Sequence, residues 1–136
     1  MKTPVLGKIT PLCLLLGLAA SVAHADVLTW DPQLTGGSGG AGTWNLNTTA
    51  NWWNGSADVQ WKDNSALGTN GAIFGGTGGT VTLNSSLSAS NLAFYAQDYT
   101  LSGSGTLTLS AGMDVTQLGT GTTTIGTPLS LVGLQQ

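Results

Sequence analysis

The chain has almost none of the side chains that carry most enzyme chemistry. Its 136 residues include one cysteine and one histidine, and neither arginine nor glutamate. Cys13 and His24 both lie within the first 25 residues, together with two of the three lysines. If that segment is removed, Ser-His-Asp and Cys-His catalysis, zinc sites built from histidine or cysteine, and disulfides are all excluded.

Residues 1–25 have the pattern of a secretory signal peptide. They contain a positively charged start, an apolar centre between Ile9 and Leu18, and the small-residue site Ala23-His24-Ala25. The apolar centre is shorter than the roughly 20 residues that a membrane span needs. We therefore expect cleavage after Ala25, export of the rest, and no membrane insertion once the signal peptide is removed.

The mature part, residues 26–136, is acidic. It holds six aspartates and one lysine, Lys62, which gives a net charge of −5. Nucleic acids and anionic membranes attract basic surfaces. Neither is an expected partner.

A short glycine- and threonine-rich unit recurs in the second half of the chain. Alternate residues of a strand point to opposite faces, so the aliphatic residues of each copy can enter a core while the threonines face outward. The pattern predicts an all-β fold of short strands, two or three to each coil of roughly 20 to 25 residues. The copies are Gly79-Thr80-Val81-Thr82-Leu83, Gly105-Thr106-Leu107-Thr108-Leu109, Gly121-Thr122-Thr123-Thr124-Ile125 and the shortened Tyr99-Thr100-Leu101.

Hydrophobic alternation and turn residues place the expected strands along the whole mature chain. They are expected at 27–30, 42–44, 59–61, 72–74, 80–83, 91–94, 99–101, 106–109, 113–115, 122–125 and 129–131.

All five tryptophans lie between positions 30 and 61. One interpretation is that the indoles are buried and close the N-terminal end of a β-stack, since each can bury on the order of 200 Å². The other is a carbohydrate-binding module, in which exposed rings of Trp52, Trp53 and Trp61 stack on sugars. Polar partners for such a platform would be Asn45, Asn51, Asp58 and Asp63.

The ordered tryptophans and the strand repeats together resemble bacterial autotransporter-associated β-strand repeat proteins. The resemblance implies a right-handed parallel β-helix, part of a passenger that is displayed at the cell surface or released. It rests on Trp30-Asp31, Gly42-Thr43-Trp44, Ala50-Asn51-Trp52, Val59-Gln60-Trp61, Ala72-Ile73-Phe74-Gly75-Gly76 and Gly79-Thr80-Val81-Thr82-Leu83, continued by Asn91-Leu92-Ala93-Phe94, Tyr99-Thr100-Leu101-Ser102-Gly103 and Thr106-Leu107-Thr108-Leu109.

This organisation predicts a Trp/Gly-rich cap region over residues 26–78 and β-strand repeats over 79–136. Because nothing after Leu131 has the character of a cap, we expect a fragment of a longer passenger whose last strand edges permit edge-to-edge association. A small β-sandwich is the alternative fold.

Catalysis would have to depend on paired aspartates, either Asp58 with Asp63 or Asp98 with Asp114. Neither pair lies in a catalytic motif, and the glycine runs lack the aspartate of calcium-binding β-roll repeats. We expect a non-catalytic structural segment with an adhesive role, without a metal or cofactor. Its expected partners are surface glycans or other cell-surface components.

Overall fold

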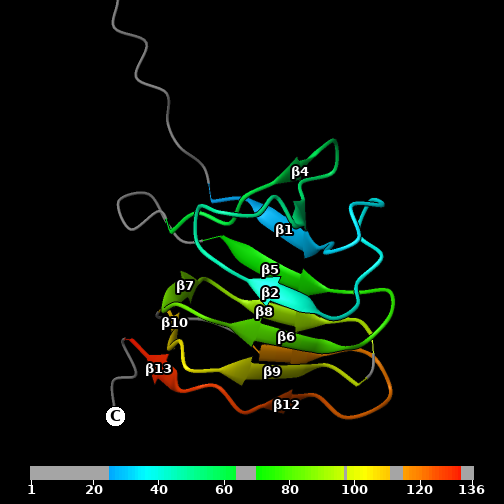
Figure 1. The fold of residues 1–136 in the computed structure, drawn as a ribbon. Helices are drawn as coiled ribbons and strands as arrows, with labels where there is room; N and C mark the ends of the chain where they lie inside the picture. The colour runs from blue at the N-terminus through cyan, green and yellow to red at the C-terminus, as the bar shows by residue number, and fades with distance from the viewer. Residues whose placement is uncertain (1–24, 64–69, 97, 111–114, 133–136) are drawn as a thin grey trace, which may run out of the picture.

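The computed structural model describes residues 25–63, 70–96, 98–110 and 115–132. The regular secondary structure in this part of the chain consists of β-strands alone, and no strand is longer than four residues (Figure 1). No helix in it is long and apolar enough to span a membrane. The strands are β1 (Val27–Trp30), β2 (Gly42–Trp44), β3 (Trp52–Trp53), β4 (Asp58–Val59), β5 (Gly71–Phe74), β6 (Thr80–Leu83), β7 (Leu87–Ala89), β8 (Leu92–Phe94), β9 (Thr100–Gly103), β10 (Leu107–Leu109), β11 (Val115–Gln117), β12 (Thr124–Ile125) and β13 (Leu129–Leu131).

The strands form three sheets, ordered β11-β8-β5-β1-β3-β4, β12-β9-β6-β2 and β13-β10-β7. The chain visits the three sheets in the same order three times. We call each passage a strand triplet: β5–β7, β8–β10 and β11–β13. Neighbouring triplets pair in parallel in every sheet. Among the described strands, antiparallel pairing occurs only where β3 joins β1 and β4, so the sheets differ from the antiparallel layers of the alternative β-sandwich.

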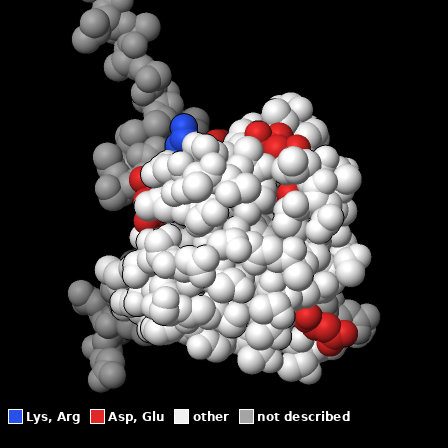
Figure 2. All heavy atoms as spheres, in the orientation of Figure 1, with Lys and Arg blue, Asp and Glu red and all other residues white. Residues whose placement is uncertain are grey.

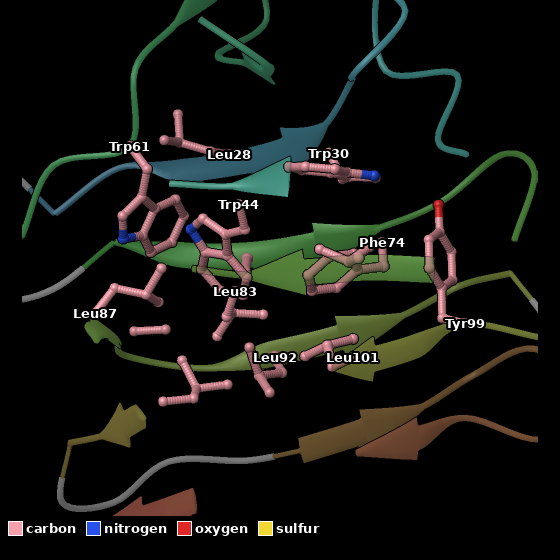
Figure 3. Close-up of a cluster of buried hydrophobic side chains, with 14 of the residues drawn as sticks. Leu28, Trp30, Trp44, Trp61, Phe74, Leu83, Leu87, Leu92, Tyr99 and Leu101 are labelled. Atoms are coloured by element: carbon pink, nitrogen blue, oxygen red, sulfur yellow. The ribbon is translucent and has the colours of Figure 1, made fainter. Parts of the chain in front are cut away.

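The register places chemically similar residues above one another. Leu87 pairs with Leu107 and Leu107 with Leu129, while Val81 pairs with Leu101. Partners in successive triplets are 20 to 24 residues apart, as the repeat length predicts. The core therefore consists of stacked columns of side chains enclosed by the three sheets (Figure 3).

The recurring Gly-Thr-x-Thr copies do not share one column. Thr80–Leu83 stacks on Thr100–Gly103 in one sheet, whereas Leu107–Leu109 stacks on Leu87–Ala89 in another. Any half-buried strand can use alternating threonine and aliphatic residues. Similarity between the copies therefore identified three strands that stack in one sheet, β6, β9 and β12, but it wrongly grouped β10 with them.

Most predicted strands are present, with shifts of a few residues. Two were not predicted: β3 and β7. Trp61 was placed in a strand but makes only an isolated bridge with Leu46, and the first residues of the strand expected at 113–115 lie outside the described part. The boundary at residues 78 and 79 stays a prediction. The regions on its two sides share two sheets.

Candidate functional site

A cluster of aromatic rings fills the N-terminal end of the core. Four of the tryptophans are completely buried, and Trp52 lies among the other three, with ring centroids 4.6 to 5.1 Å away. Phe74 continues the cluster and stacks on Phe94 with ring centroids 4.8 Å apart, at a paired position of the next strand. Such pairs contribute about 0.5–1.5 kcal/mol beyond their burial. The cluster thus joins the first strands to the triplets.

The three residues of the predicted sugar platform occupy different environments. Trp52 and Trp61 have no exposed surface, so a sugar ring cannot stack on either in this conformation. Only Trp53, which points to the other face of β3, is half-buried and has an accessible surface.

At this same end, the outer edges of β1, β7 and β2 have hydrogen-bond partners. The edge of β1 pairs with β3, which pairs with β4. At β7, the Trp61 indole donates to the Ser88 carbonyl (3.1 Å) and Asp63 accepts from the Ser88 amide (2.9 Å). At β2, the Asn51 side chain donates to the Thr43 carbonyl (2.6 Å). We refer to these groups as the N-terminal cap. They occupy backbone groups through which an exposed edge would recruit another strand.

Asp31 holds the glycine-rich loop that follows β1. Its buried carboxylate accepts from the Gly36 amide (2.6 Å) and from the Ser38 hydroxyl (3.3 Å). Burial alone would raise the pKa of Asp31, but backbone N–H donors across residues 35–38 outweigh it and lower the pKa.

At Gly39, φ is +74°, and a Cβ atom would lie 2.2 Å from the Gly75 carbonyl oxygen, so this position requires glycine.

Tyr99 links the glycine-rich loop after β1 to the strand triplets through hydrogen bonds. Its hydroxyl donates to the Gly75 carbonyl (2.7 Å) and accepts from the Gly40 amide (3.3 Å). Burial raises the pKa of this phenol, so the hydroxyl remains protonated and able to donate at neutral pH.

Asp58 lies beside Asp31. Desolvation raises the pKa of Asp58, and so do the negative charge of Asp31 and a hydrogen bond with it. A folded-state pKa above the ordinary value of 3.8 means that Asp58 favours folding at lower pH. That contribution is lost as the pH rises through the raised pKa. Asp31 has the opposite effect, because its lowered pKa adds stability that disappears as the pH falls.

We expect Asp58→Asn to increase the free energy of unfolding at pH 7. The gain should be only roughly 0.5 kcal/mol, because water screens a partly exposed carboxyl. The gain should become smaller at pH values below the ordinary carboxyl pKa, where Asp58 is protonated in the wild type. Urea denaturation at several pH values measures it. The wild type, measured at the same pH values, is the reference. An Asp58→Asn variant that is less stable at pH 7 would contradict the expected repulsion.

The structure supports neither of the two predicted acid–base pairs. Asp58 faces Asp31, whereas Asp63 binds the β7 backbone. Asp98 is exposed and its proposed partner, Asp114, lies outside the described residues. In the part of the chain that is described, no three His, Cys, Asp or Glu side chains are grouped as metal ligands require. The visible face in Figure 2 carries few charged atoms.

At the opposite end of the stack, the open end, no described residue lies beyond the last strands. β11, β12 and β13 are each the last strand of their sheet. Leu107 is completely buried, whereas its column partner Leu129 is 43% exposed; Leu109 and Leu131 show the same contrast, at 0% and 51%. The last triplet thus carries apolar side chains at core positions that no described residue covers.

A polar hollow of about 460 Å³ lies outside β2. The outward-facing Thr43 contributes to it, the loop after β2 supplies Asn45, Thr49 and Asn51, and Asn84 follows β6. Sequence reasoning named Asn45 and Asn51 as sugar-binding groups but placed them beside exposed tryptophans. Thr43 and Asn84 were missed, because only the pairing of Trp44 with Leu83 brings β2 beside β6.

Comparison with known proteins gives one informative similarity. The chain is 40% identical over 118 residues to "Adhesin BmaC autotransporter" of Brucella suis biovar 1 (strain 1330). This match covers 82% of the chain and 3% of that protein. It confirms the resemblance to autotransporter-associated passenger proteins. No protein-family description matches the chain. No solved structure matches it significantly.

Proposed function

We propose that this chain is the capped N-terminal part of a right-handed parallel β-helix in an autotransporter passenger that is exposed at the cell surface and has an adhesive role. The difference between the two ends carries the proposal. The N-terminal cap provides hydrogen-bond partners at the outer edges of β1, β2 and β7, while no described residue covers the core positions of β11–β13 at the other end.

The strand order supports a β-helix. Three strands per triplet, parallel pairing and a constant order of sheets are the geometry of a stacked repeat. Crossover connections between parallel strands are right-handed in nearly all proteins. A further triplet could stack on β11–β13 and cover their apolar side chains, as each described triplet covers the one before it.

The adhesive role is supported by the name of the similar Brucella protein and by the surface chemistry of this chain. The described part exposes threonine, serine and asparagine over stable sheets, without a catalytic arrangement of side chains. An exported scaffold of this kind presents hydrogen-bonding groups at fixed positions and performs no reaction.

Export and adhesion can be tested separately. Expression of the full chain in a Gram-negative host should yield an exported protein that begins at Asp26. Beads coated with that protein should adhere to epithelial cells more than beads coated with albumin or with the unfolded chain. Retention of residues 1–25 in the cytoplasm would contradict export. Adhesion equal to that of albumin would contradict the adhesive role.

A further inference from the structure

The polar hollow beside β2 has the features of a small binding site. Its volume of about 460 Å³ is in the range of small-molecule sites, roughly 300–1,000 Å³. The parallel pairing of β2 with β6 places two asparagines side by side. Trp44 pairs with Leu83, and the next residues along the chain, Asn45 and Asn84, follow the ends of these two strands. Pro32 forms part of its wall.

Asn51 supplies a buried acceptor that lacks a partner. Its Nδ2 donates to the Thr43 carbonyl at 2.6 Å, and since a carbonyl can only accept, this bond fixes which side of the amide is oxygen. The remaining Oδ1 is buried and accepts no hydrogen bond from any described residue. Leaving such an atom unpaired costs about 1–3 kcal/mol, and buried polar atoms in native proteins normally have a partner.

The side-chain amides of Asn45 and Asn84 differ in whether they already have hydrogen-bond partners. Asn45 is held in place by Thr49, whose hydroxyl and backbone amide bind its side chain at 2.9 and 3.0 Å. Asn84 is exposed, and its side chain makes no hydrogen bond to the described residues. The hollow therefore combines fixed groups with one amide that is free to donate and accept.

The chemistry of the lining selects the kind of ligand. Every polar side chain in it is an amide or a hydroxyl, and none is ionisable. Hydroxyl groups of a ligand can both donate to and accept from such groups, whereas an anionic or cationic ligand would find no opposite charge to offset its desolvation.

We propose that this hollow binds one neutral sugar unit of a surface glycan, with Asn84 and Thr43 as its hydrogen-bonding groups and with the Asn51 amide holding the Thr43 backbone in place. The inference rests on the adhesive role proposed above and names the chemical class of its ligand. The site is distinct from the predicted tryptophan platform, two members of which are buried in the core.

Nuclear magnetic resonance titration of the full chain with methyl glycosides of glucose, galactose and N-acetylglucosamine tests the proposal. We expect at least one glycoside to give saturable shifts at the Asn84 side-chain amide and the Thr43 backbone amide, with a Kd of about 1–10 mM. Free sialic acid should give none. Asn84→Ala and Thr43→Val should each raise Kd at least about fivefold, a loss near 1 kcal/mol.

Thr108→Val is the matched control, because Thr108 is also a half-buried, outward-facing threonine but lies in another sheet. It should leave Kd unchanged. The proposal would be overturned by three results: no shifts up to about 50 mM glycoside, shifts that map elsewhere, or an unchanged Kd in folded Asn84→Ala protein. If beads coated with Asn84→Ala protein adhere as well as wild-type beads, the sugar site is wrong and the adhesive role stands.

Discussion

Replacing Trp52 with alanine should lower the free energy of unfolding by about 4 kcal/mol, whereas the same change at Trp53 should cost less than about 1 kcal/mol. Trp52 has no exposed surface and lies within 5.7 Å of four other rings, measured between centroids. Trp53 points outward on the same strand and is half-buried. Because domains are stable by only about 5–15 kcal/mol, the first change should remove a large part of the stability while leaving enough folded protein to measure.

Chemical denaturation followed by circular dichroism measures both variants against the wild type. The pair is well matched, since the two changes remove the same number of atoms from adjacent positions of β3. Similar losses for the two variants, or a greater loss for Trp53→Ala, would contradict the assignment of Trp52 to the core.

Two lysines at the open end should weaken self-association. The wild-type chain is expected to associate at high concentration, because β11–β13 present unpaired strand edges beside the exposed Leu129 and Leu131. The double change Leu129→Lys and Leu131→Lys puts charge at that surface. It should weaken association at least tenfold, about 1.4 kcal/mol, as measured by size-exclusion chromatography with light scattering.

The control places the same two charges at the capped end. Val27 and Leu34 are 60% and 57% exposed, so Val27→Lys with Leu34→Lys removes a comparable apolar surface. This variant should associate like the wild type. Equal effects of the two double variants would show that net charge alone prevents association, and a wild-type chain that stays monomeric would contradict the open end.

Local sequence patterns were sufficient to predict an all-β chain and most of its strands. The alternation in Thr80–Leu83 and Leu107–Leu109 reflects which side chains face the core, and this requirement acts within one strand. Pairing depends instead on contacts 20 or more residues away. For that reason Leu107–Leu109 was grouped with the similar copies in β6, β9 and β12, although the fold places it in another sheet.

The antiparallel cap was harder to predict. The sequence Trp52-Trp53 is only two residues long as a strand, and its neighbours favour turns. Its position is decided by the pairing of Thr29 with Trp53 and by ring contacts with Trp30, which are tertiary effects.

Only part of the candidate sugar site could be predicted from the sequence. Asparagines were recognised as sugar-binding groups by their chemistry, but their location depends on the register between β2 and β6. The role of Asp31 had a local signal, a carboxylate followed by a glycine-rich loop whose backbone amides could reach it. Its interaction with Asp58 joins residues far apart in the chain and left no such pattern.

Native-state hydrogen exchange at two equivalent threonines tests most directly whether the stack is closed at one end and open at the other. The Thr100 amide donates to the Gly79 carbonyl (3.0 Å), and the Thr124 amide donates to the Tyr99 carbonyl (2.9 Å), one triplet nearer the open end. We expect Thr124 to exchange at least about a hundredfold faster, because the last triplet opens without disturbing the capped core. Equal protection of Thr100 and Thr124, or faster exchange at Thr100, would contradict the account.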